Sequence, residues 1–163
     1  MRGTSMKGAV VITGVGKRLG LALAHDLLEK GYRVVGTYRT DYPELEDLQA
    51  KGADLHQVDF YQPESLNGFI QYLNLEYSQL RALIHNASDW SPDEPARSNN
   101  HAQVLQRMMA IHVGAPYQMN LALQGLLNQG LTPTISFTLA IMWLKKAVKN
   151  TQPMQPVSLR STT

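Results

Sequence analysis

Cysteine is absent from the 163 residues of the chain. Its absence excludes disulfides, thiolate metal sites and a cysteine nucleophile, and it favours a reducing compartment. A strong charge of one sign is also missing, because 15 Lys and Arg stand against 13 Asp and Glu, for a net charge of +2. An excess this small predicts no nucleic-acid partner and no membrane partner.

Long apolar runs are lacking too. The longest stretch, residues 135–144, is interrupted by Ser136 and Thr138 and is too short to span a bilayer. The first apolar run, residues 8–13, is shorter than the core of a signal peptide. The five His residues show no metal-binding spacing. We therefore expect a cytoplasmic protein that holds no metal.

What the chain does have is an alternation of short β-branched runs and helix-spaced apolar residues. The runs predict strands at 9–13, 32–38, 53–60 and 80–85, with a fifth able to begin at 134–137; the helical patterns cover 18–30, 43–51, 63–77 and 101–128. Strands joined by such helices form right-handed crossovers and a parallel sheet. The fold class is therefore α/β: a doubly wound parallel sheet of Rossmann type, incomplete at the C-terminal side. We expect a partial Rossmann-type NADP-binding domain over residues 1–137 and an aberrant, disordered tail over 138–163.

The strongest motif is the glycine turn, residues 13–20, where the first strand ends and the first helix begins. Glycines at Gly14, Gly16 and Gly20 allow a tight turn and a close approach of the backbone to a pyrophosphate, and the helix N-terminus adds free N–H groups. A tight turn that binds nothing is the alternative.

The end of the second strand indicates which dinucleotide binds. Domains that bind NAD usually place an Asp or Glu there, to accept from the ribose 2′-OH. Here Arg39 and Thr40 take that place, and Arg39 offers a fork suited to a 2′-phosphate. Lys17 and Arg18 add positive charge across the turn, so the sequence favours NADPH. Asp41, an acidic residue close by, argues against this preference. The alternative interpretation of Arg39 is a solvated charge at the end of the strand that binds no phosphate.

These residues resemble a known family. The Thr-Gly-x-x-x-Arg-x-Gly pattern of residues 13–20 is similar to the cofactor loop of short-chain dehydrogenases/reductases, with Arg18 in place of the middle glycine. With residues 38–40, 86–88 and 111–117, the chain resembles the pteridine reductase and dihydromonapterin reductase branch. The resemblance implies NADPH-dependent reduction of a pterin or dihydrofolate, usually in a homotetramer.

The motifs and the resemblance together give one set of expected cofactor-binding residues, in which Asp59 contacts the adenine. The set is Gly14, Lys17, Arg18, Leu19, Gly20, Arg39, Thr40, Asp59, Phe60, Asn86, Ala87 and Ser88. In the family an Asn near position 112 sits at a helix kink whose freed carbonyl holds a water. Here the residue is His112, and Pro116 removes the N–H that would bond its carbonyl. A helix that starts near Pro116 is the alternative to a kink.

The family's catalytic Tyr-x-x-x-Lys pair, expected after the fifth strand, is missing. No Tyr follows Tyr117, so we assign no catalytic residue and expect the chain to be inactive. A non-catalytic NADP-binding module is the alternative function, and a non-functional truncated product is another.

The codons of the tail suggest a cause. When the third base of each codon is joined to the first two of the next, residues 153–158 permit Tyr-Ala-Ala-Ser-Lys, and residues 140–143 permit Asp-Tyr-Val. We interpret the chain as a frameshifted, truncated member of the branch, with loss of one base near residues 130–134. A diverged C-terminus is the alternative. Truncation would expose apolar helix residues such as Met108, Met109 and Leu121, so we expect marginal stability.

Overall fold

The computed structural model describes residues 7–89, 101–129 and 135–138. Its strands form one parallel sheet in the order β3-β2-β1-β4-β5. Their bounds are β1 Lys7–Thr13, β2 Tyr32–Tyr38, β3 Asp54–Gln57, β4 Leu80–His85 and β5 Ile135–Thr138. The predicted parallel α/β sheet is confirmed. The predicted domain boundary falls inside β5, and residues 139–163 of the expected tail lie outside the described residues.

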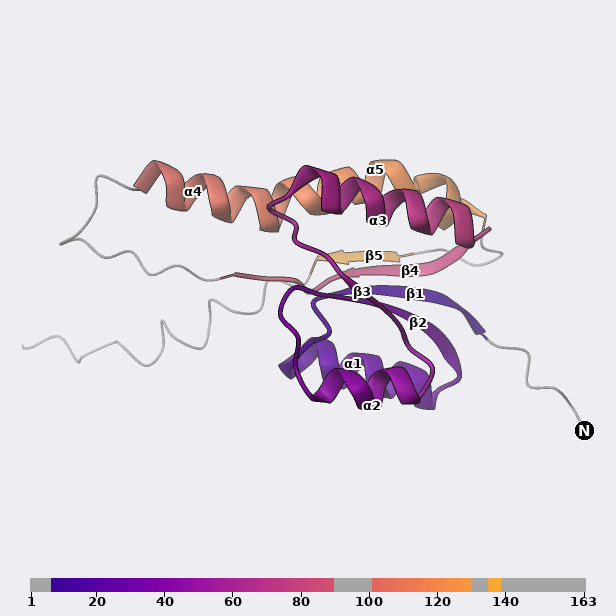
Figure 1. Cartoon of the computed structure of the whole chain (residues 1–163). Coiled ribbons are helices and arrows are strands. Elements are labelled where there is room, and N and C mark those ends of the chain that lie inside the picture. Colours follow the sequence, from indigo (N-terminus) through magenta and orange to yellow (C-terminus); the bar gives the residue numbers. More distant parts are fainter. Residues whose placement is uncertain (1–6, 90–100, 130–134, 139–163) are drawn as a thin grey trace, which may run out of the picture.

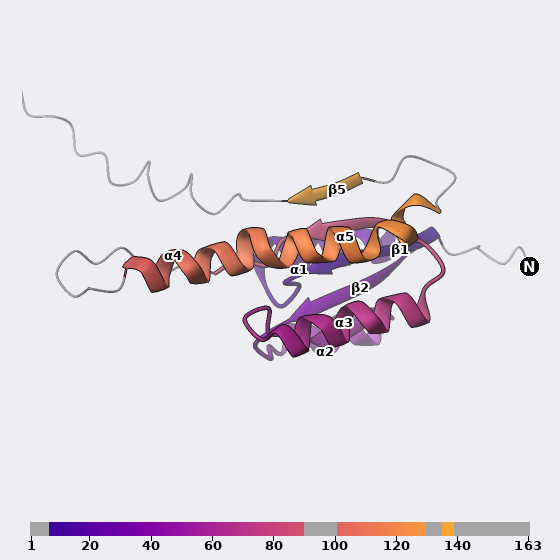
Figure 2. The ribbon, with the colours of Figure 1, turned by 90° about the horizontal axis from the view of Figure 1, so that it is seen from above.

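Helices cover the two faces of the sheet. On one face lie α1 (Arg18–Glu29) and α2 (Glu44–Ala50), and on the other lie α3 (Pro63–Glu76) and α5 (Ala115–Asn128) (Figures 1 and 2). Helix α4 (His101–Met109) continues the line of α5 beyond the carboxyl edge of the sheet (Figure 1). This edge carries the ends of all the strands, so it gathers the residues that follow them.

The core has one part on each face of the sheet. Along β1 successive side chains point to opposite faces. Val11 packs with Leu83 of β4 and Met119 of α5 on one face, and Ile12 packs with Leu48 of α2 on the other. All five side chains are fully buried. Burial on both faces explains why β1 is apolar without alternation.

The third strand is shorter than predicted. β3 ends at Gln57, whereas the sequence predicted a strand over 53–60. Asp59 turns the chain, because its Oδ1 accepts the backbone N–H of Tyr61 at 3.0 Å. An Asp side chain that bonds the backbone two residues ahead favours a turn over a strand.

The long helix predicted over 101–128 is continuous but not uniform. Between α4 and α5 runs a π-helical turn, η1, at Ala110–Gly114. The N–H of Ala115 donates to the carbonyl of Ala110, five residues back, and Pro116 falls in the first turn of α5. A proline lacks the N–H that an α-helix needs, and a π turn is one way to insert such a break. The helix therefore neither starts at Pro116 nor ends before it.

One side of this long helix is exposed and apolar. Residues at four-residue intervals form a row that we call the outer stripe: Leu105 (63% exposed), Met109 (49%), Val113 (49%), Tyr117 (64%) and Leu121 (57%). The predicted exposure of Met109 and Leu121 is confirmed, whereas Met108 is half-buried. In the described part of the chain, no helix is long and apolar enough to cross a membrane.

The carboxylate of Asp54, at the start of β3, accepts hydrogen bonds from two tyrosines. Asp54 Oδ2 accepts from the hydroxyls of Tyr72 (2.6 Å) and Tyr77 (2.8 Å), and its Oδ1 lies 2.8 Å from His56 Nε2. Burial alone would raise the pKa of Asp54, but the two hydroxyls and His56 together lower it. Burial and the same carboxylate raise the pKa of Tyr77 to about 12.

We expect Asp54→Asn to destabilise the fold at pH 7 by about 1–2 kcal/mol, a value discounted because the carboxylate is partly exposed. A pKa that is lowered by folding contributes stability above the unfolded value and loses it as the pH falls through the folded one. The difference between wild type and variant should therefore shrink on acidification, as measured by urea unfolding from pH 7 downwards. Asp47→Asn, at an exposed pair with Lys51, is the control. Equal effects of the two variants would contradict the prediction.

Candidate functional site

The glycine turn (residues 13–20) is fastened to β2. The N–H groups of Gly14 and Val15 both donate to the carbonyl of Thr37, at 2.9 and 2.8 Å. Gly14 has a φ of 76°, in the left-handed region that favours glycine. The turn is therefore held in one conformation by the neighbouring strand.

The same turn is fastened to the segment after β4. The buried hydroxyl of Thr13 accepts the N–H groups of Asn86 and Ala87, each at 3.0 Å. The side-chain amide of Asn86 donates to the carbonyls of Thr13 (3.1 Å) and Gly14 (2.8 Å). Sequence analysis assigned Asn86 and Ala87 to the site, and the structure brings both against the turn.

Glycine is required where these segments meet. A Cβ on Gly20 would lie 2.1 Å from the Gly14 carbonyl oxygen, and a Cβ on Gly14 would lie 2.9 Å from the Cα of Ala87. Arg18, where the family pattern has a glycine, has a φ of 55°. A left-handed conformation costs a non-glycine residue roughly 1–2 kcal/mol, which explains why glycine is the usual choice there.

The first turn of α1 suits an anion. Lys17 is the N-cap residue, yet no side chain caps the helix and its first turn holds no acidic residue. Its first N–H groups can therefore bond a diphosphate, with the helix dipole in support. Leu19, in the same turn, is 40% exposed. The residues present fit a dinucleotide diphosphate.

Lys17 is held by a residue that the sequence did not single out. Its Nζ donates to the Tyr42 hydroxyl at 2.8 Å and lies 4.9 Å from the centre of that ring. This hydrogen bond lowers the pKa of Tyr42, and Arg39 nearby lowers it further. Tyr42 therefore holds Lys17 beside the turn. Thr40, beside Arg39, is exposed.

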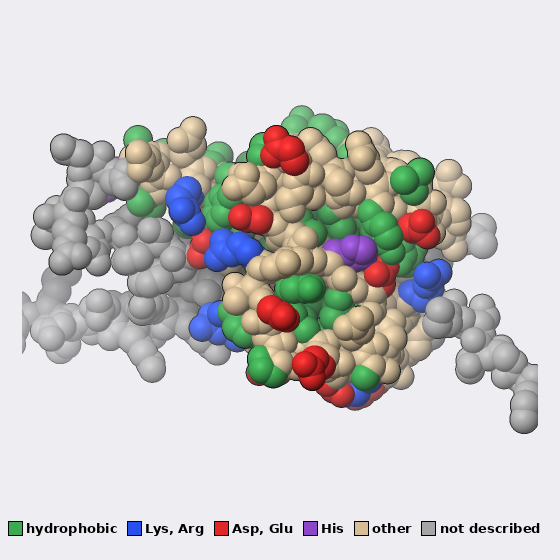
Figure 3. All heavy atoms as spheres, in the orientation of Figure 1, with side chains coloured by type: hydrophobic (Ala, Val, Ile, Leu, Met, Phe, Trp, Pro, Cys, Tyr) green, Lys and Arg blue, Asp and Glu red, His purple; other side chains and the backbone are tan. Residues whose placement is uncertain are grey.

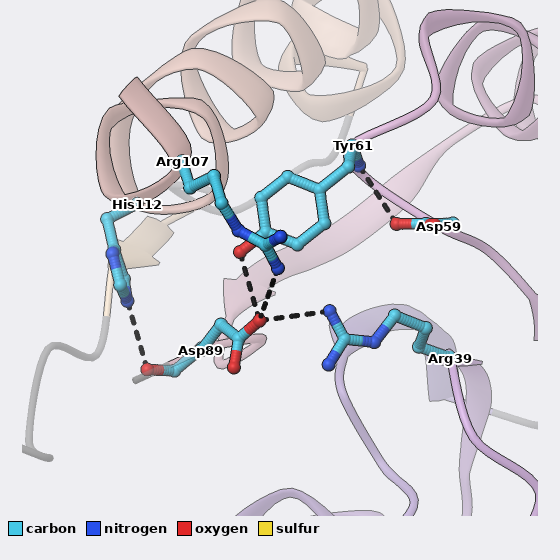
Figure 4. A network of polar contacts seen from close by, with 7 residues as sticks. Arg39, Asp59, Tyr61, Asp89, Arg107 and His112 are labelled. Atoms are coloured by element: carbon cyan, nitrogen blue, oxygen red, sulfur yellow. Dashed lines mark hydrogen bonds and ion pairs between the residues drawn. The ribbon is translucent and has the colours of Figure 1, made fainter. Parts of the chain in front are cut away.

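Three side chains meet at one carboxylate oxygen, Asp89 Oδ2 (Figure 4). Arg39 Nη1 and the Tyr61 hydroxyl donate to it at 3.1 Å each, and Arg107 Nη2 lies 3.6 Å away. We call Arg39, Tyr61, Asp89 and Arg107 the Asp89 cluster. In Figure 3, acidic and basic side chains lie together at the α4 end of the molecule.

Contact with Asp89 shifts the pKa values of Arg39 and Tyr61. The hydrogen bond to Asp89 raises the pKa of Arg39 more than burial lowers it. Burial, followed by the charge of Asp89, raises the pKa of Tyr61, so this phenol stays protonated and donates. At neutral pH the oxygen of Asp89 is thus surrounded by two cations and a hydroxyl.

The remaining predicted residues have local partners. Asp59 closes the turn after β3, and Phe60 is half-buried against the core under α3. The Ser88 hydroxyl lies 3.0 Å from His112 Nε2. His112 Nδ1 lies 3.0 Å from the Met108 carbonyl, which fixes the proton on Nδ1. The Ser88 hydroxyl therefore donates to Nε2. His112, which occupies the position near which the family has an asparagine, thus contacts Ser88 through its side chain.

Sequence analysis missed Tyr42, Tyr61, Asp89 and Arg107. Tyr61 lies one residue beyond the predicted Asp59-Phe60 pair, and Asp89 one residue beyond Ser88, so short extensions of two motifs would have included both. Tyr42 and Arg107 had no local signal, because only the fold brings them to the carboxyl edge.

Residues 8–132 match the short chain dehydrogenase family. The chain belongs to the short-chain dehydrogenase family. Within this family, the dihydromonapterin reductase of Klebsiella pneumoniae is 43% identical over 119 residues, 73% of this chain and 49% of that protein. The dihydromonapterin reductase of Enterobacter sp. is 41% identical over 126 residues, 77% of this chain and 52% of that protein. The chain spans about half the length of the curated relatives it matches.

Solved structures agree with the fold. The RhlG/NADP active-site complex of Pseudomonas aeruginosa aligns with a TM-score of 0.69 at 20% identity, over 82% of this chain and 54% of that one. A short-chain dehydrogenase from Streptomyces avermitilis aligns with a TM-score of 0.63 at 23% identity, over 75% and 44%. At such identities the likeness concerns the fold alone.

Proposed function

We propose that this short-chain dehydrogenase chain binds NADPH at the carboxyl edge of its sheet, through a dinucleotide-binding unit of residues 1–137. The diphosphate would lie on the glycine turn and the uncapped N-terminus of α1. This proposal rests on one observation: the glycine turn is hydrogen-bonded on both sides, to the carbonyl of Thr37 and to the side-chain amide of Asn86. A turn held from both sides is organised before the ligand arrives.

We assign the 2′-phosphate to Arg39, with Lys17 and Thr40 beside it. Arg39 is the first residue after β2, where an NAD-binding domain would carry an acidic side chain. Asp41 lies two residues further along and is exposed. The proposed preference for NADPH over NADH therefore rests first on the guanidinium of Arg39.

The reaction we propose for the intact relative of this chain is NADPH-dependent reduction of a pterin or dihydrofolate, which the similarity to dihydromonapterin reductases supports. NADPH supplies a hydride when it is bound. In the family a Tyr passes the proton to the substrate, and no Tyr follows Tyr117 in this chain. We therefore propose a chain that holds the cofactor without turning it over, in the cytoplasm. The second candidate function is a non-catalytic NADP-binding module, which the absence of the Tyr-x-x-x-Lys pair also favours.

Titration with NADPH, followed by a turnover assay with a dihydropterin and with dihydrofolate, tests the proposal. Saturable binding without turnover is the expected result. Turnover would contradict the assignment of no catalytic residue, and the absence of binding would contradict the dinucleotide site.

We expect Arg39→Gln to weaken NADPH binding about tenfold, because a charge-assisted contact to phosphate is lost from a half-exposed site. The affinity for NADH, which has no 2′-phosphate, should change little. Arg33→Gln is the matched control, since Arg33 is the second residue of the same strand, at the opposite edge of the sheet, and packs over Tyr77. Isothermal titration measures all three proteins. An equal loss for NADPH and NADH would contradict the assignment of Arg39.

We also propose that copies of this chain associate through the outer stripe, in keeping with the homotetramer that the family resemblance implies. The row of five exposed apolar side chains supports this, because such rows are typical of interfaces. Met109→Lys should shift the protein toward monomer in sedimentation velocity. Leu75→Lys, at an 84% exposed leucine on α3, is the control. A monomeric wild type would contradict this proposal.

A further inference from the structure

The Asp89 cluster joins parts of the chain that are far apart in sequence. Arg39 follows β2, Tyr61 lies between β3 and α3, Asp89 follows β4 and Arg107 lies on α4. All three partners converge on the same oxygen of Asp89 (Figure 4). The contact of Arg39 with Asp89 therefore connects the segments after β2 and β4 across the carboxyl edge.

The partners of Asp89 form a donor set for an anion. The guanidinium groups of Arg39 and Arg107 lie 5.7 and 4.7 Å from the centre of the Tyr61 ring, so the phenol holds both close to the carboxylate. Two guanidiniums and one hydroxyl are the groups that bind phosphate well. In this structure the anion they hold is the protein's own.

The carboxylate can be replaced by a ligand. The side chain of Asp89 is 24% exposed, and those of Arg39 and Arg107 are 47% and 59% exposed. Ion pairs with this much solvent contact are weak. A phosphate carries more charge and more acceptor oxygens than a carboxylate, so it can compete for the same donors.

We propose that Asp89 is an internal competitor that occupies the anion site of Arg39 and Arg107, so that the 2′-phosphate of the cofactor must displace it. This inference rests on the proposed binding of NADPH. It adds two specificity-determining residues: Asp89, which lowers the affinity for the phosphate, and Arg107, which binds the phosphate once Asp89 has left. A ligand without the phosphate leaves Asp89 in place.

The test compares two fragments of the cofactor by isothermal titration of the full chain. 2′,5′-ADP carries the 2′-phosphate and 5′-AMP lacks it. Asp89→Asn should bind 2′,5′-ADP about three- to tenfold more tightly than wild type, because two exposed ion pairs no longer compete. Its affinity for 5′-AMP should stay within about twofold of wild type, since that ligand leaves Asp89 in place. Asp26→Asn, which also removes one negative charge but at an exposed pair with Lys30 on α1, should leave both affinities unchanged.

A second variant tests Arg107. Adding Arg107→Gln to Asp89→Asn should remove most of the gain for 2′,5′-ADP. A weaker affinity of Asp89→Asn for 2′,5′-ADP would overturn the inference and assign Asp89 to the positioning of Arg39. An unchanged affinity would overturn it as well, because Asp89 would then not compete with the phosphate. If wild type and variants bind 2′,5′-ADP no better than 5′-AMP, the inference falls together with the proposed 2′-phosphate site. The two failures are distinguished by whether any of these proteins binds 2′,5′-ADP more tightly than 5′-AMP.

Discussion

Gly20→Ala should destabilise the fold by about 3 kcal/mol, the upper range for overpacking a closed site. The new Cβ would lie 2.1 Å from the Gly14 carbonyl oxygen and 2.4 Å from Asn86 Nδ2. Neither atom can move alone, because the Asn86 amide is bonded to that oxygen at 2.8 Å. The clash would therefore open the glycine turn, and we expect NADPH binding to fall with it.

The sign of the effect makes this prediction specific. In an ordinary helix interior, Gly→Ala stabilises by about 0.5–1 kcal/mol, because alanine has the higher helix propensity. Gly68→Ala on α3 is the matched control, since a Cβ there meets nothing within 4 Å. Urea unfolding of the two variants should give changes of opposite sign. Stabilisation by Gly20→Ala would show that the turn is not closed as described.

Sequence reasoning reached the parts of this chain that are determined by local chemistry. The unbroken apolar run of β1 indicated a strand buried on both faces, and the glycines after it indicated the turn, because Gly14 and Gly20 meet steric limits set within a few residues. The Thr13 hydroxyl lies in the same motif, yet its bonds to Asn86 and Ala87 join positions 73 and 74 residues apart.

The parts that sequence reasoning missed depend on tertiary contacts. Arg107 looked like any exposed helical arginine, and only the extension of α4 past the sheet brings it to Asp89. The π turn at η1 was not distinguishable from a kink, because Pro116 requires a break in the hydrogen bonding but does not determine its form. Asp59 ended β3 early through an Asx turn, which apolar patterning does not record.

Restoring the reading frame is expected to have the largest effect. Insertion of one base in the codons of residues 130–134 would let the downstream DNA encode Tyr-Ala-Ala-Ser-Lys, with the first Ala forced by the junction of Met154 and Gln155. That segment supplies the proton donor that the printed sequence lacks after Tyr117. We expect turnover of a dihydropterin with NADPH to rise by about 10² to 10⁴-fold, the usual contribution of a positioned general acid.

The controls separate chemistry from folding. A second repaired gene, in which the recovered Tyr codon encodes Phe, should bind NADPH as well as the repaired protein but reduce the substrate far more slowly. The unrepaired protein should bind NADPH without turnover under the same conditions. DNA that cannot encode the motif in the shifted frame would contradict the frameshift. Equal turnover by the unrepaired and repaired proteins would instead show that the substrate takes its proton from a group other than the Tyr-Lys pair.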